Sequence, residues 1–404
     1  MRKIAFWLAL VLLFMIPWEN SVIVDGVGRI SRLMGILVAA FWLGTVLATG
    51  KFRQLRPFHI LVFLYFFWNS ITILWSSDVS DTMDRITTYV QLFVFAWLIW
   101  DLFTTKEAIR AGLQAFVLGS YVSVIDTISN YFSGVSRGST PRYAAEGFNA
   151  NGLALIVALS LPIAWYLAIS ATSDGTKKTK LFSTVNFIYI PLGVFAVLLT
   201  ASRTALIGMV PTFWFILGAS AKLRFVDRLV ISLFLGVALY FIQPLIPQTS
   251  LDRLSTTQTE LTEGDLSGRR LIWEEALGVF ENNSLIGTGS GTFKAAVDFK
   301  DKSAHNTYLA ILVESGAIGF GLFLLVVATS GYHLRYLPKW EALFWFTMLV
   351  VWAIGITTMS WEIKKPTWLL LNMVVIHAAV FRKPDTLPQL VLPQRPRPKR
   401  LVAE

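Results

Sequence analysis

Long apolar runs recur along the chain, and most of them are separated by short polar connections. Apolar runs of about 18 residues or more are long enough for an α-helix to cross a bilayer. The pattern therefore predicts an all-α polytopic membrane protein with about twelve transmembrane helices. The predicted spans are 4–18, 27–48, 58–75, 87–103, 111–132, 151–170, 185–201, 204–220, 228–246, 306–332, 341–359 and 366–381. The first has no small-x-small cleavage site before Glu19, so we expect a retained anchor.

One connection, residues 247–303, is much longer than the others. Its first part, 248–268, is rich in Ser, Thr, Asp and Glu, and we expect it to be irregular or weakly helical. Apolar residues then recur at helical spacing and predict an amphipathic helix on the bundle or at the membrane interface. These residues are Ile272, Ala276, Leu277 and Phe280. We divide the chain into spans one to nine (1–246), this loop (247–303), spans ten to twelve (304–381) and a Pro/Arg-rich tail (382–404).

The composition agrees with a membrane protein: 55% of the residues are hydrophobic, only 15% are charged, and the mean hydropathy is +0.60. The net charge of +10 comes mostly from Lys and Arg in alternate connections and in the tail. By the positive-inside rule, both termini are cytoplasmic and the long loop is on the outer face. The basic excess therefore reflects topology and attraction to anionic lipid rather than nucleic-acid binding. The absence of cysteine excludes disulfides, Cys-ligated zinc and thiol catalysis.

The segment 303–319 carries the strongest chemical signal. His305 and Asn306 open a long apolar run, and Gly316 and Gly319 follow. At 100° per residue, His305 and both glycines fall in one sector of the predicted helix, and the glycines let another helix pack close beneath the imidazole. A histidine also titrates near neutral pH, which suits proton abstraction. We predict a reactive site at His305, although an interfacial helix-capping residue is the simpler alternative.

Several arginines are predicted on the same outer face. Arg203 lies in the short turn between spans seven and eight, where it could bind an anion or simply snorkel to the interface. Arg269 and Arg270 open the loop helix, and only one of these neighbours is expected to point into a site; a solvated face with Glu274 and Glu275 is the alternative. The planar guanidinium fork suits phosphate. The pattern favours a diphosphate clamp beside a general base.

Other polar features carry weaker signals. The outer segment 133–150 adds Arg137 and Arg142 as candidate substrate-binding residues. The glycine-rich run 287–291 is not followed by Gly-Lys-Ser/Thr and is not a P-loop. Asp78, Asp81 and Asp84 lack the company of metal-ligand motifs, so we predict no metal site. Two acids inside predicted spans, Asp126 and Glu314, are candidates for function by default. Glu314 is expected about 180° around the helix from His305, so it would not share the site directly.

These motifs together resemble those of a known family. His305-Asn306, nine residues and then Gly316-x-x-Gly319 is similar to the signature of the O-antigen ligase family. Three further stretches resemble the same family, and the resemblance covers roughly 140–335. They are the loop segment Gly268 to Trp273 with Leu285 to Gly289, the turn Ser202-Arg203-Thr204, and Asn149-Ala-Asn151-Gly.

The resemblance implies a C-type-like membrane glycosyltransferase in the bacterial inner membrane. It would transfer O-antigen from undecaprenyl diphosphate to a sugar hydroxyl of lipid A–core oligosaccharide on the periplasmic face. His305 would orient or deprotonate the acceptor hydroxyl, with Asn306 beside it, while Arg203 and either Arg269 or Arg270 would hold the diphosphate. A single displacement would invert the anomeric centre without a metal or cofactor.

Three alternatives stay open from the sequence. A polysaccharide polymerase would use the same lipid-linked donor with a growing chain as acceptor. A protein-directed transferase is disfavoured, since the chain has no sizeable extra outer domain. A transporter would use Asp126 and Glu314, but it would be expected to show polar residues from several helices near mid-bilayer or a repeated half, and neither is found.

Overall fold

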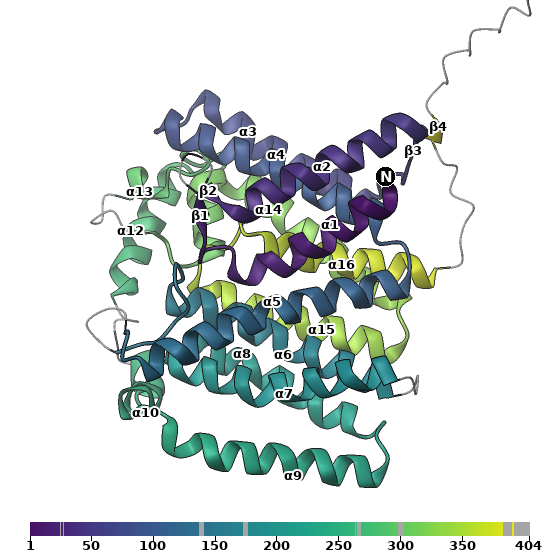
Figure 1. Cartoon of the computed structure of the whole chain (residues 1–404). Coiled ribbons are helices and arrows are strands. Elements are labelled where there is room, and N and C mark those ends of the chain that lie inside the picture. Colours follow the sequence, from purple (N-terminus) through teal and green to yellow (C-terminus); the bar gives the residue numbers. More distant parts are fainter. Residues whose placement is uncertain are drawn as a thin grey trace, which may run out of the picture.

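The computed structural model is a bundle of roughly aligned helices with a layer of short helices at one end (Figure 1). It describes residues 1–24, 26, 28–136, 141–172, 177–262, 264, 268–297, 303–382 and 390–391. Each predicted span overlaps one long helix. These helices are α1 (Arg2–Met15), α2 (Ile30–Thr49), α3 (Pro57–Ile71), α4 (Val79–Leu102), α5 (Lys106–Phe132), α6 (Ala150–Thr172), α7 (Lys177–Thr200), α8 (Arg203–Ser220), α9 (Phe225–Ile242), α14 (Thr307–Tyr332), α15 (Lys339–Gly355) and α16 (Lys365–Phe381).

The predicted fold class, an all-α polytopic membrane protein, is confirmed. Within the described residues, nine helical stretches are long and apolar enough to cross a membrane, and α16 is apolar but shorter. The exact number of twelve spans stays a prediction, because α1 has only 14 residues and α4 carries several charges in its first turns.

The predicted long loop is more regular than its composition suggested. Its first part forms two short helices, α10 (Gln248–Ser255) and α11 (Thr257–Thr262), which agrees with the weakly helical alternative rather than the irregular one. The predicted amphipathic helix is confirmed as α12 (Arg269–Asn282), and α13 (Phe293–Ala296) follows it. Short strand pairs and 3₁₀ turns complete the described part. They are β1 (Ile23–Val24) with β2 (Gly28–Arg29), β3 (Lys51–Phe52) with β4 (Leu390–Val391), η1 (Ile16–Trp18), η2 (Thr72–Leu74), η3 (Gln243–Leu245), η4 (His333–Tyr336) and η5 (Ile356–Thr358).

The helix α6 forms the centre of the bundle. Every residue of its most apolar stretch is buried, and α6 packs against α5, α7, α8 and α15. A helix that is apolar on all sides is stable when other helices surround it, as they do here. At the edge of the bundle, α9 buries none of its apolar stretch, and its most exposed apolar side chains, Phe225 and Tyr240, lie where lipid would cover them (Figure 1).

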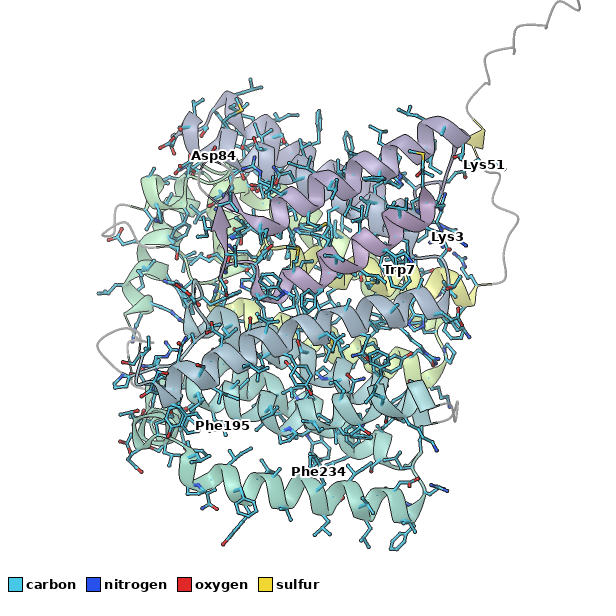
Figure 2. The ribbon with its side chains drawn as sticks, in the orientation of Figure 1. Lys3, Trp7, Lys51, Asp84, Phe195 and Phe234 are labelled. Carbon is cyan, nitrogen blue, oxygen red and sulfur yellow. The ribbon has the colours of Figure 1, made fainter. Side chains whose placement is uncertain are left out.

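The two ends of the bundle differ in what they carry. We call the end with α10, α12 and α13 the loop end (Figure 1). Asp84 lies at this end, whereas Lys3 and Lys51 lie at the opposite end together with the N-terminus (Figure 2). The residues that the sequence singled out can now be located against this frame.

Candidate functional site at the loop end

His305 lies just outside a helix rather than on one. Asn306 is the N-cap of α14, and its side-chain oxygen accepts a hydrogen bond from the Leu309 N–H at 3.2 Å. An Asn in this position satisfies one of the free N–H groups of the first turn. His305 precedes the cap with a φ of +46°, so its backbone is left-handed. The prediction that the imidazole shares a helical sector with the two glycines was therefore wrong.

The predicted helical sector also fails because α14 is interrupted at Gly316, whose φ of 66° and ψ of −171° are not helical. The segment after α12 fills the break. The N–H groups of Thr288 and Gly289 donate to the carbonyls of Val313 and Glu314, both at 2.9 Å. On the other side of the break, the Ala317 N–H donates to the Ser284 carbonyl at 2.8 Å. The loop thus satisfies backbone groups that the helix leaves free.

The two glycines of the motif have different structural roles. A Cβ at Gly316 would lie 2.3 Å from the Leu285 carbonyl oxygen, so this glycine admits the loop backbone, not a helix. A Cβ at Gly319 would lie 3.1 Å from the indole of Trp68, and α14 packs closely on α3 there. The predicted close helix contact is therefore found at Gly319 alone.

The loop helix α12 holds the segment before His305. The Trp273 indole N–H donates to the Ala304 carbonyl at 2.9 Å, and Ile272 and Ala276 are buried against Ala304. The predicted apolar face is correct at Ile272 and Ala276, but Leu277 is 48% exposed because it lies on the far side of α12. Arg269 lies one turn before Trp273, so one short helix carries both the support of His305 and a basic group.

Four arginines gather where α7, α8, α10 and α12 meet: Arg142, Arg203, Arg253 and Arg269. Burial and then the charges of the other three lower the pKa of Arg142 to about 10. Burial and the neighbouring Arg203 lower the pKa of Arg253, and burial and Arg253 lower that of Arg269. Like charges held this close repel one another, and an anion between them would relieve that repulsion. We call these four residues the arginine cluster.

Hydrogen bonds to backbone and side-chain oxygens fix two members of the cluster. Arg142 donates to the Thr200 carbonyl at 2.8 Å and to the Asn151 side chain at 2.6 Å. Arg203 donates to the Arg253 carbonyl at 2.8 Å and to the Thr256 hydroxyl at 2.7 Å. These contacts join the start of α8 to α10, and the start of α6 to the end of α7.

Negative charge is scarce around the cluster. Arg203 lies 3.5 Å from the Glu260 carboxylate, which is the one acid paired with these arginines in the described part of the chain. Within that part, Arg269 makes no hydrogen bond or ion pair, and the Nε of Arg253 is buried without a partner. A buried donor without an acceptor is costly, so the Nε of Arg253 favours an anionic ligand, and the half-buried Arg269 can donate to the same ligand.

Arg253 was missed by the sequence reasoning. It is the single Lys or Arg between Gln248 and Gly268, in a segment otherwise rich in acids and hydroxyls. Its position as the single basic residue of this segment was the signal that could have identified it as a site residue. The segment was expected to be irregular or weakly helical, and this expectation gave Arg253 no neighbour, whereas α10 places it beside Arg203.

The structure separates the two neighbouring arginines of the loop helix. Arg270 is 69% exposed and pairs with Glu274 at 3.0 Å, on the face of α12 that points away from the bundle. Its predicted role in substrate binding stays a prediction, and so does that of Arg137, which lies outside the described residues.

Several residues next to the site have a left-handed backbone conformation. Among the described residues that are not glycine, only Ala201 and His305 have positive φ, at 48° and 46°. Ala201 immediately precedes the cap of α8 and Arg203, and Gly268, with φ of 78°, immediately precedes Arg269. A left-handed non-glycine residue costs roughly 1–2 kcal/mol, and such residues cluster at functional sites.

The two intramembrane acids have structural partners at the loop end. The Asp126 carboxylate accepts a hydrogen bond from the Glu146 N–H at 2.7 Å, which ties α5 to the segment carrying Arg142. Glu314 is buried, accepts from the Gly291 N–H at 2.9 Å and lies 3.7 Å from Arg85. Within the described residues, no three His, Cys, Asp or Glu side chains are grouped as a metal site.

Comparison with known proteins gives one match. Residues 188–324 match the family model described as O-antigen ligase. The matched range includes Arg203, Arg253, Arg269, His305 and the part of α14 that contains the break at Gly316. No curated protein matches the chain.

Proposed function

We propose that the protein is an O-antigen ligase, because its residues 188–324 match the family model described as O-antigen ligase. The family supports glycosyl transfer of the ligase or polymerase type in lipopolysaccharide biosynthesis. In our proposal the donor is O-antigen polysaccharide on undecaprenyl diphosphate, and the acceptor is a sugar hydroxyl of lipid A–core oligosaccharide. The reaction takes place at the loop end, on the periplasmic face of the inner membrane, and both termini are cytoplasmic.

The observation that carries this proposal is the arginine cluster. Four guanidinium groups with one paired carboxylate among the described residues form a strongly positive site, and the Nε of Arg253 is buried there without a partner. A diphosphate offers enough oxygen atoms and negative charge to satisfy them. In our proposal the diphosphate binds in the cluster with its glycosidic bond toward the imidazole. The helix α12 supports this placement, because it carries Arg269 and, through Trp273, holds Ala304 next to His305.

The proposed step is a single displacement. The acceptor hydroxyl oxygen attacks the anomeric carbon, and the bond from that carbon to the diphosphate oxygen breaks. His305 takes the hydroxyl proton, and undecaprenyl diphosphate leaves with the bonding electron pair, its new charge stabilised by the arginine cluster. Attack opposite the leaving group inverts the anomeric centre. The step requires no metal ion or cofactor.

Deletion of the gene tests the reaction class. We expect lipopolysaccharide that ends at the core, with lipid-linked polymer accumulating, because the donor is made but not transferred. Gel analysis of lipopolysaccharide and mass spectrometry of the lipid-linked fraction would measure both products. Core carrying a single repeat unit would instead identify a polymerase, and unchanged lipopolysaccharide would contradict both. Restoring the intact gene on a plasmid provides the control.

The neighbouring arginines Arg269 and Arg270 provide a matched pair of variants. Arg269→Ala should lower the rate of transfer about a hundredfold, since removing one donor to developing charge commonly costs that much. Arg270→Ala should change it less than about threefold, because an exposed ion pair such as Arg270–Glu274 contributes little. Transfer is measured in membranes that contain equal amounts of each variant. Two equally mild effects would remove α12 from the diphosphate site.

A further inference from the structure

A polar cavity at the loop end adjoins the segment that precedes His305. It has a volume of about 350 Å³ and is lined by residues of α4, the loop 291–294, the segment 303–304, α14 and the segment 360–363. Binding sites for small molecules commonly have roughly 300–1,000 Å³. The Ser303 hydroxyl in its wall lies 3.4 Å from the Nε2 of His305, so the cavity adjoins the imidazole.

Buried charges form one wall of this cavity. Arg85 lies between Glu362, at 3.1 Å, and Glu314, at 3.7 Å, and both carboxylates are almost fully buried. One oxygen of Glu362 bonds Arg85, but the other has no hydrogen-bond partner among the described residues. The Ser360 hydroxyl in the same wall is also buried without a partner. A buried carboxylate oxygen with no donor calls for a ligand that donates hydrogen bonds.

The rim of the cavity is acidic. Asp81 and Asp84, which the sequence singled out without assigning them a role, line it from the start of α4. With Glu314 and Glu362 they give four carboxyl groups, against the two basic groups of Arg85 and Lys294. Asp84 lies at the loop end beside α3, whereas α10 of the arginine cluster lies at the opposite edge of that end (Figures 1 and 2).

The arginine cluster and this cavity therefore have opposite charge. The arginine cluster attracts phosphate, and the cavity repels it because its carboxyl groups outnumber its basic groups. Carboxylates accept hydrogen bonds from hydroxyl and amine groups, which are the groups that a sugar without acidic substituents presents. A cation is a weaker candidate, since no three of these acids are grouped as a metal site within the described residues.

From this arrangement we infer that the cavity binds the acceptor sugar, as a hydroxyl-rich unit without phosphate or carboxylate. Its hydroxyls donate to Asp81, Asp84 and Glu362, and the hydroxyl to be glycosylated faces Ser303 and His305. The inference rests on the proposed function and adds a specificity to it. Donor and acceptor occupy separate sites of opposite charge, and His305 lies between them.

Steady-state kinetics with purified protein in vesicles tests the inference. Lipid-linked O-antigen is held at saturation while lipid A–core is varied, and the reverse experiment varies the donor. Two variants are compared, Asp84→Asn and the double variant Asp81→Asn/Asp84→Asn. In the double variant we expect the KM for the acceptor to rise about tenfold. The KM for the donor should not change. Glu275→Gln, an exposed carboxylate on α12 that does not line the cavity, is the matched control.

The outcomes separate the inference from the function on which it rests. An unchanged acceptor KM in the double variant, or a rise in the donor KM instead, would overturn the inference while leaving transfer by the unmodified protein intact. Loss of that transfer on treatment with EDTA, restored by Mg²⁺ or Ca²⁺, would make the cavity a cation site and also overturn it. An unmodified protein that transfers nothing would overturn the proposed function, and the acceptor assignment with it.

Discussion

Replacing His305 with alanine should lower the rate of transfer by about a hundredfold or more, because general bases typically contribute 10²–10⁴-fold. Without the imidazole, the acceptor hydroxyl must lose its proton to solvent while it attacks. The variant should still insert and fold, since the cap and first turn of α14 depend on Asn306. Transfer is measured with saturating donor and acceptor in membranes of matched protein content.

The donor site gives an internal check on the His305 variant. Binding of undecaprenyl diphosphate, followed as a rise in thermal stability, should be unaffected because the arginine cluster is intact. His333→Ala is a suitable control, since His333 lies at the other end of α14, where it bonds the Thr329 carbonyl. Normal transfer by His305→Ala would show that the imidazole is not the base and would leave only electrostatic stabilisation by the arginines.

Replacing Gly316 with alanine should nearly abolish transfer by displacing the loop that fills the break in α14. The backbone conformation at Gly316 is one that side chains rarely adopt, which costs roughly 1–3 kcal/mol. The new Cβ would also lie 2.3 Å from the Leu285 carbonyl oxygen, so the loop backbone must move. Movement there disturbs the Thr288 and Gly289 hydrogen bonds and the nearby Gly291–Glu314 contact.

Limited proteolysis provides a readout for Gly316→Ala that is independent of activity. We expect faster cleavage within 284–292 in the variant than in the unmodified protein. Gly321→Ala is the matched control, because a Cβ there meets nothing within 4 Å and alanine favours the helix. Equal cleavage and equal transfer for Gly316→Ala would contradict the role assigned to the interrupted helix.

Much of the architecture could be predicted because membrane helices are encoded locally. A long apolar run must form its own backbone hydrogen bonds in lipid, so composition and length alone indicate a helix. The helical spacing of Ile272 and Ala276 likewise located α12, because one face of a short helix has to be covered. The start of α12 at Arg269 followed from the same pattern.

Long-range contacts account for what the sequence reasoning missed. The apolar run from Leu309 onward gives no sign of a break, since the hydrogen bonds that stabilise Gly316 in a non-helical conformation come from the loop 284–289. In the same way, Arg253 is an ordinary polar position until α10 places it beside Arg203. Adjacent residues such as Arg269 and Arg270 differ only in which face of α12 they occupy.

The sequence by itself determined the class of the protein, the positions of its long helices and the set of residue types available for phosphate binding and proton transfer. Only the tertiary structure decided which arginines meet, that His305 precedes its helix with a left-handed backbone, and that an acidic cavity adjoins the imidazole. The physical reason is the range of the interactions. Helix formation in lipid depends on neighbouring residues, whereas a site of defined charge depends on groups brought together from distant segments by packing.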